Sequence, residues 1–182
     1  NIQLTIDLEY QSILEEELKK RQDETSSSSA TGIIMDPETG EILAMATTPG
    51  FDNNHFGSTR PEFHRIKSIT DQFEPGSTFK VVSTVSALYD GLISLHDEFN
   101  CENGSFEYHT KKITDHESYS MLTASQIIHH SSNIGIIKIM DQVGRKKLFS
   151  MSRDFGFGSK TGINLNGEVS GKLNHYNDWS AV

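Results

Sequence analysis

The sequence predicts a domain of the α+β class, and three features of its 182 residues indicate this. Two strand-like runs joined by a tight turn lie near the N-terminus. Several stretches with apolar residues at helical spacing follow, and glycines stand at their ends. The chain is also long enough to bury a substantial core. We therefore expect a single domain over residues 1–182 that combines sheet strands with a helical region.

Residues 1–50 predict the first strands and one helix. "NIQLTI" alternates like a short strand, and Asp7 stands where an N-cap would begin the helix "LEYQSILEEELKKR". "QDETSSSSA" is typical of a flexible polar loop. "TGIIMDPETGEILAMATTPG" contains two apolar runs joined by "DPETG", which predicts a β-hairpin. The expected buried stripe of the helix consists of Leu8, Ile13, Leu14 and Leu18.

Residues 51–72 are irregular and predict loop with short helical turns, whereas residues 74–91 predict a buried helix. Gly91 stands where a left-handed C-terminal cap is expected. Residues 94–120 are polar and turn-rich. The apolar positions at helical spacing in residues 74–91 are Val81, Val82, Val85 and Leu88.

Residues 121–158 predict a helical region. "LTASQIIHH" is a short helix that Thr123 can cap, and it ends at "SSN". "IGIIKIMDQVG" and "RKKLFSMSRDFG" are two further helices, closed by Gly144 and Gly156. The remaining tail is glycine-rich loop.

Composition excludes several classes of protein. The net charge is −9, with 16 Lys and Arg against 25 Asp and Glu, which argues against nucleic acid and anionic membranes as partners. No apolar stretch approaches the ~20 residues of a membrane span. Cys101 is the single cysteine, so no internal disulfide can form, and we expect it to be a small buried hydrophobe. The histidines lack ligand spacing, so we expect no metal and no cofactor.

Ser77 and Lys80 form a candidate catalytic pair at the start of the 74–91 helix. A serine becomes a nucleophile when a base takes its proton, and a residue three positions later lies one turn away on the same face. As a base, Lys80 needs its pKa lowered by roughly three to four units, or about 4 to 5 kcal/mol, by burial and nearby positive potential. The helix N-terminus supplies such potential, and the Ser77 N–H can donate to an oxyanion.

The same residues also fit an ordinary polar first turn. Serine is a favoured N-cap, and a Ser-x-x-Lys spacing arises by chance in many proteins. The catalytic interpretation gains weight from Ser131-x-Asn133, a hydroxyl and an amide at another helix end. Such a corner could relay a proton and hold a substrate amide.

Five segments together resemble the transpeptidase domain of penicillin-binding proteins, particularly the monofunctional class B group. "ITDQFEPGSTFKVVSTVSALYDG" and "IIHHSSNIGIIKIM" resemble its first and second active-site motifs. The framing segments are "IQLTIDLEYQSILEEEL", "GIIMDPETGEILAMATTPGFDNN" and "FGFGSKTGINLNGE", in the order of the family. The resemblance covers essentially the whole chain and implies the penicillin-binding protein/β-lactamase-like fold.

The resemblance implies a role for each motif residue. Ser77 would attack the carbonyl of a D-Ala-D-Ala stem peptide and form an acyl-enzyme, with Lys80 as the base. Ser131 would relay the proton to the leaving D-alanine, and Asn133 would bind the peptide amide and orient Lys80. A second stem peptide would accept the acyl group, and β-lactam antibiotics would acylate Ser77 as covalent inhibitors.

The resemblance also implies a location and partners. We expect the protein at the extracytoplasmic face of the bacterial cell membrane, anchored by a segment outside this chain. Its expected substrates are peptidoglycan stem peptides. Division or elongation proteins would bind through regions that are not present here.

The family has a third motif, Lys-Thr/Ser-Gly on a strand, and this chain departs from that pattern. Lys160-Thr161-Gly162 matches the letters, but it lies in the glycine-rich "FGFGSKTGINLNGE" segment without strand character, so we interpret it as a coincidence. We therefore expect the chain to be the N-terminal two-thirds of one transpeptidase domain. On that basis the 182 residues alone should acylate poorly.

Two other functions remain open. A serine β-lactamase shares the Ser-x-x-Lys motif but needs a carboxylate to activate water, for which Glu168 has a plausible spacing from Ser131. A non-catalytic β-lactam sensor or scaffold module would carry the same motifs. The pair Asp115-His116 could line the cleft near Ser131, although an ordinary loop turn is the simpler interpretation.

Overall fold

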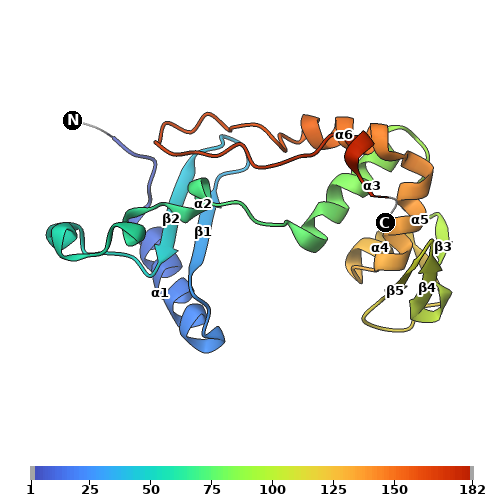
Figure 1. Ribbon diagram of the computed structural model, residues 1–182, viewed down its shortest axis with the longest axis horizontal. Coiled ribbons are helices and arrows are strands. Elements are labelled where there is room, and N and C mark those ends of the chain that lie inside the picture. Colours follow the sequence, from blue (N-terminus) through green and yellow to red (C-terminus); the bar gives the residue numbers. More distant parts are fainter. Residues whose placement is uncertain (1–2, 181–182) are drawn as a thin grey trace. The chain divides into compact units, whose positions relative to one another are not determined.

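The computed structural model of the chain describes residues 3–180, which divide into two units (Figure 1). The first unit consists of Asn1–Asp71 and Asn164–Val169, and the second consists of Gln72–Ile163 and Ser170–Val182. The chain therefore forms the first unit, continues into the second, returns for one short segment and leaves again. Among residues 3–180, no helix combines the length and the apolar character needed to cross a membrane.

The first unit is built on a β-hairpin covered by a helix. Helix α1 (Leu8–Thr25) packs against strands β1 (Ala30–Met35) and β2 (Ile42–Thr48), which pair antiparallel. The Asp7 carboxylate begins α1 by accepting two backbone N–H groups of its first turn. The predicted helix start and hairpin are thus confirmed.

A close approach of α1 to β1 holds this unit together. A Cβ added at Gly32 would lie 2.8 Å from Leu14 Cδ1, so a larger residue at this position would require the leucine side chain to shift. The side-chain amide of Gln11 bonds the N–H and the carbonyl of Met45, at 2.9 and 3.0 Å. Hydrogen bonds therefore supplement the apolar contact between helix and hairpin.

The predicted stripe of α1 is only half correct. Leu14 and Leu18 are half-buried, whereas Leu8 and Ile13 are 82% and 51% exposed. The physical reason is that, within this unit, α1 packs on one hairpin alone, so only a narrow face of the helix is covered. A helix with that little cover needs no wide apolar stripe.

The boundaries of the first unit also differ from the predictions. Residues 3–6 form no strand, and positions 1 and 2 lie outside the described residues. Helix α1 continues through residues 22–25, predicted as loop, and ends where Ser26 takes a positive φ of 52°. The short helical turns predicted for residues 51–72 are confirmed. They are η1 (Asn53–Ser58), η2 (Pro61–His64) and α2 (Lys67–Thr70).

The second unit combines helices with two small antiparallel sheets. Strand β3 pairs with β6, and β4 pairs with β5. Its helices are η3 (Gly76–Phe79), α3 (Lys80–Tyr89), η4 (Glu102–Gly104), α4 (Ala124–His129), α5 (Asn133–Val143), α6 (Arg145–Asp154) and η5 (Tyr176–Asp178). Its strands are β3 (Glu98–Asn100), β4 (Ser105–Tyr108), β5 (Lys111–Thr114) and β6 (Met121–Thr123).

The core of this unit lies where α3, α4 and α5 meet β3 and β6. Ile127 and Ile134 are fully buried in it, and Gly135 faces Ile127 so closely that an added Cβ would lie 2.5 Å from Ile127 Cγ1. Cys101 is also fully buried there, which confirms the expectation for it. The core therefore depends on a glycine at a helix crossing.

Most of the helices predicted in the second unit are confirmed, whereas its four strands were not predicted from the sequence. Thr123 caps α4 in a capping box, and Gly144 is the C-cap of α5 as expected. The expected Gly156 follows the Phe155 C-cap of α6, with a φ of 88°. The turn-rich interpretation of residues 94–120 was incomplete, because three short strands lie between the turns. Val81 is 49% exposed although predicted on the buried face.

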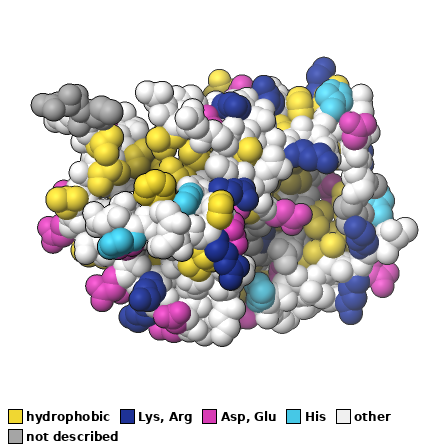
Figure 2. Space-filling model, turned by 60° about the vertical axis from the view of Figure 1, so that its left-hand side comes forward, with side chains coloured by type: hydrophobic (Ala, Val, Ile, Leu, Met, Phe, Trp, Pro, Cys, Tyr) yellow, Lys and Arg dark blue, Asp and Glu magenta, His cyan; other side chains and the backbone are white. Residues whose placement is uncertain are grey.

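The surface mixes charges of both signs. Figure 2 shows Lys and Arg side chains interspersed with Asp and Glu on the face that it presents. This pattern accompanies the net charge of −9.

Candidate active site

Ser77 and Lys80 lie at the start of the buried helix α3. Gly76, with a φ of 58°, turns the chain into the η3 segment, and the Lys80 N–H donates to the carbonyls of Ser77 and Thr78 as η3 passes into α3. Ser77 is exposed and Lys80 is half-buried. The candidate nucleophile is therefore accessible to a substrate, while the candidate base is partly withdrawn from water.

The Lys80 amine is the centre of a polar cluster. Its Nζ atom lies 2.5 Å from the Ser131 carbonyl oxygen, 3.0 Å from Ser131 Oγ and 2.8 Å from Asn133 Oδ1. Within residues 3–180, these are all the hydrogen bonds of the amine, so none joins it to Ser77 Oγ. The structure thus brings Lys80, Ser131 and Asn133 into contact. Ser77, the remaining predicted site residue, lies one helical turn before Lys80.

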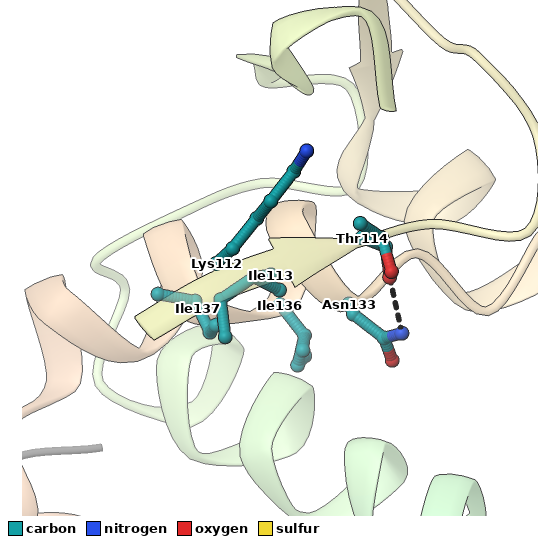
Figure 3. Close-up of a pocket in the computed structure, with 6 residues that line it drawn as sticks. All are labelled: Lys112, Ile113, Thr114, Asn133, Ile136 and Ile137. Carbon is teal, nitrogen blue, oxygen red and sulfur yellow. Dashed lines mark hydrogen bonds between the residues drawn. The ribbon is translucent and has the colours of Figure 1, made fainter. Parts of the chain in front are cut away.

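Asn133 has a defined orientation in this cluster. Its Oδ1 atom accepts from Lys80, which can offer only hydrogens when protonated, and its Nδ2 atom donates to the Thr114 carbonyl at 2.9 Å (Figure 3). Exchanging the two ends of the amide would set a donor against the Lys80 ammonium and an acceptor against the Thr114 carbonyl. Asn133 therefore holds Lys80 on one side and strand β5 on the other.

Ser131 occupies a strained corner between α4 and α5. Its φ of 55° lies in the left-handed region that serine seldom adopts, and such a conformation costs about 1–3 kcal/mol. This conformation directs both the carbonyl and the hydroxyl of Ser131 at Lys80. Strain of this kind is typical of functional sites, where the surrounding contacts maintain it.

Asp115 is a site residue for which the sequence favoured an ordinary loop turn over a place beside Ser131. Its Oδ1 atom accepts from the backbone N–H groups of Asn133 and Ile134, at 2.5 and 3.1 Å. Its Oδ2 atom accepts from the Ser132 hydroxyl at 2.6 Å. The interpretation of Asp115 as an ordinary loop turn was therefore incomplete, because the carboxylate holds the first turn of α5.

The electrostatics of the cluster lower the pKa of Lys80. Burial lowers the pKa of the Lys80 ammonium from its ordinary value of 10.5, and the negative charge of Asp115 partly opposes this decrease. A lowered pKa means that a larger fraction of the amine is unprotonated at a given pH. This is the direction that a general base requires.

A pocket of about 450 Å³ borders the cluster (Figure 3). Asn133 belongs to both, and the Thr114 carbonyl that fixes the asparagine also lies on the pocket wall. Its other lining residues are Lys112, Ile113, Ile136 and Ile137.

The remaining candidates from the sequence are Lys160-Thr161-Gly162 and Glu168. Residues 160–162 of the Lys-Thr-Gly sequence lie in a segment without helix or strand. Glu168 belongs to the first unit, whereas Lys80 and Ser131 belong to the second. Over residues 3–180, no cluster of His, Cys, Asp and Glu side chains has the arrangement of a metal site.

Comparison with known proteins identifies the fold and the family. Residues 30–181 match the model of the penicillin binding protein transpeptidase domain. The apo structure of the TP domain from Burkholderia pseudomallei penicillin-binding protein 3 superposes with a TM-score of 0.85 at 26% identity, over 98% of this chain and 49% of that one. The α+β transpeptidase fold predicted from the sequence is thereby confirmed.

Curated relatives agree with this result. The chain is 32% identical over 182 residues to peptidoglycan D,D-transpeptidase FtsI of Escherichia coli K12, and 31% identical over 176 residues to stage V sporulation protein D of Bacillus subtilis. It spans 31% and 27% of their lengths. The chain belongs to the penicillin-binding protein transpeptidase family, as its resemblance to the class B group predicted.

Proposed function

We propose that this chain carries the acylation site of a peptidoglycan D,D-transpeptidase, with Ser77 as the nucleophile. The observation that carries the proposal is the Lys80 amine in contact with Ser131 Oγ and Asn133 Oδ1, one helical turn after Ser77. The names of several relatives, peptidoglycan D,D-transpeptidases, support the substrate class.

The proposed reaction is an exchange of one amide for another. Neutral Lys80 takes the hydroxyl proton of Ser77 as Oγ bonds to the carbonyl carbon between the two D-alanines of a stem peptide. The carbon–nitrogen bond then breaks, and the terminal D-alanine leaves with a proton passed from Lys80 through Ser131. The amine of a second stem peptide attacks the resulting ester, which forms the cross-link and returns the proton to Ser77.

The hydrogen bonds of the cluster suit this relay. Ser131 Oγ lies 3.0 Å from Lys80 Nζ, so a proton accepted from Ser77 can move onward without a change in backbone conformation. Asn133 keeps one amide hydrogen beyond the bond to Thr114, and we assign that hydrogen to the stem peptide. β-Lactams would enter by the same acylation step and remain as esters of Ser77.

The wider context follows from the family. We propose that residues 1–182 form part of one transpeptidase domain that works at the extracytoplasmic face of the cell membrane. The proposed substrates are peptidoglycan stem peptides, and the proposed partners are proteins of cell division or elongation.

Labelling with a fluorescent penicillin tests the proposal. We expect the full-length protein to bind the label covalently, and Ser77→Ala to bind none while keeping its circular dichroism spectrum. Labelling that persists in Ser77→Ala would refute the role of Ser77. The same assay on the 182 residues alone tests the expectation that they acylate poorly.

The fate of the acyl-enzyme distinguishes the transpeptidase from the β-lactamase and the sensor module. A persistent acyl-enzyme supports the transpeptidase, whereas rapid hydrolysis of a chromogenic β-lactam that Glu168→Gln abolishes would indicate a β-lactamase. Acylation without cross-linking of a stem-peptide donor to an acceptor amine would indicate a sensor module.

A further inference from the structure

We propose that Asp115 is a positioning residue for the acylation step. Its carboxylate fixes the Ser131–Asn133 corner against Lys80 and acts on the amine as a negative charge. The inference rests on the proposed function of Ser77 and Lys80. It adds a residue outside both motifs, from the loop that follows strand β5.

The first support is the use of both carboxylate oxygens. Helix α5 begins at Asn133, and the first N–H groups of a helix have no partner inside the helix. Asp115 Oδ1 accepts two of them, from Asn133 and Ile134, while Oδ2 accepts the hydroxyl of Ser132. One side chain therefore holds three consecutive residues, of which Asn133 contacts Lys80 directly.

The second support is that Asp115 and Ser132 are themselves held in place. The Asp115 N–H donates to the Gly104 carbonyl at 3.2 Å. Ser132 is buried and also accepts the Gly135 N–H at 2.9 Å. Ser131 lies between these anchored groups and Lys80, so its left-handed conformation is maintained by contacts on both sides.

The third support is electrostatic. The negative charge of Asp115 raises the pKa of Lys80 and so opposes the effect of burial. Lys138 and Lys147 are engaged in ion pairs with Glu102 and Asp90. The ionisable side chains on the helices packed against α3 are His129, Lys138, Asp141, Arg145, Lys146, Lys147, Arg153 and Asp154.

Charge and geometry can be separated by two substitutions. Asp115→Asn keeps an oxygen for the backbone N–H groups and removes the charge. Asp115→Glu keeps the charge but displaces the oxygens by one methylene group. Glu117→Gln is the matched control, because it removes a negative charge from the same loop, where the Glu117 carboxylate accepts the Tyr119 hydroxyl.

The test uses the full-length protein with isotope-labelled lysine, and Lys80→Arg assigns the Lys80 signal. We expect the NMR titration midpoint of Lys80 to fall by roughly one pH unit in Asp115→Asn and to stay within a few tenths of a unit in Glu117→Gln. The acid limb of the pH profile of fluorescent-penicillin acylation should move in the same direction. Asp115→Glu should instead lower the acylation rate about tenfold or more at every pH, with an unchanged midpoint.

Equal titration midpoints of Lys80 in the wild type and Asp115→Asn would overturn the proposal. This holds even if Asp115→Asn lowers the acylation rate. If Asp115→Asn fails to fold, Asp115→Ser is the second uncharged variant for the same titration. If Ser77 is not labelled in the wild type, the proposed function is refuted but the inference about Asp115 is not. The titration of Lys80 still measures the effect of Asp115.

Discussion

The protonation state of Lys80 sets the direction of its hydrogen bonds. An ammonium carries three hydrogens and can donate to the Ser131 carbonyl, Ser131 Oγ and Asn133 Oδ1 together. A neutral amine carries two, and its lone pair must then accept the hydroxyl hydrogen of Ser131 or that of Ser77. Gaining a proton therefore reverses a hydrogen bond without moving heavy atoms.

Lys80→Arg separates the charge of this residue from its basicity. Arginine remains protonated at every accessible pH, so it can donate to Ser131 and Asn133 but cannot accept the Ser77 proton. We expect acylation by fluorescent penicillin to fall by about 10²-fold or more, with the melting temperature little changed. Retention of most of the wild-type rate would show that Lys80 is not the base.

The pH profile of the wild type gives a second test of the same residue. Because burial lowers the pKa of Lys80, acylation should rise with pH toward a midpoint below 10.5. Stopped-flow measurement of acylation against pH checks this, and a rate independent of pH up to the stability limit would contradict it.

Gly135→Ala tests the crossing of α4 and α5. An added Cβ would lie 2.5 Å from Ile127 Cγ1 in a fully buried environment, so we expect a loss of about 1–3 kcal/mol in the free energy of unfolding. Gly57→Ala is the control, because nothing lies within 4 Å of the added atom there. Urea denaturation measures both, and equal stability would show that the core yields to the methyl group.

At the scale of elements, helices with long apolar patterns and explicit caps could be predicted from the sequence. Asp7, Thr123 and Gly144 each mark a real helix boundary. The strands of residues 98–123 could not be predicted, because each has only three or four residues. In addition, β3 pairs with β6 across the intervening β4–β5 hairpin, which no local pattern shows. Periodicity needs a longer window than such strands offer.

The candidate site, like the fold, could be predicted only in part. The sequence identified Ser77, Lys80, Ser131 and Asn133 as candidates, and the structure brings the last three into contact. For Asp115 the sequence offered a place near Ser131 only as the alternative to a loop turn. The groups that Asp115 binds follow 17 to 19 positions later, and the intervening fold decides that they meet.

Thr123→Ala tests the short helix that leads to Ser131. The Thr123 hydroxyl accepts the Gln126 N–H, and the Gln126 side chain bonds back to the Thr123 N–H at 2.9 Å. We expect Thr123→Ala to cost about 1 kcal/mol in the free energy of unfolding, whereas Thr123→Ser should retain most of the stability. Urea denaturation of the pair checks this, and equal losses would point to the methyl group rather than the hydroxyl.

At the scale of the whole molecule, the chain passes between its two units through a segment without helix or strand at residues 71–75. Phe73 lies in this segment and is 84% exposed. Exposed chain without secondary structure is where proteases cut first.

Limited digestion with chymotrypsin tests that description. We expect the first cut after Phe73, and Phe73→Ser should slow it, as mass spectrometry of early fragments would show. Tyr89 is the control site, because it is 81% exposed but belongs to helix α3. A first cut after Tyr89 would mean that α3 opens more readily than the connecting segment.

Cys101 gives this site a built-in reporter. The thiol is fully buried, burial raises its pKa, and its Sγ atom lies 3.6 Å from the Ser132 hydroxyl that Asp115 binds. A thiol reagent can reach it only when the structure beneath the Ser131 corner opens. The rate of thiol modification in the native protein therefore measures how often the structure opens there. The measurement needs no substrate, antibiotic or mutation.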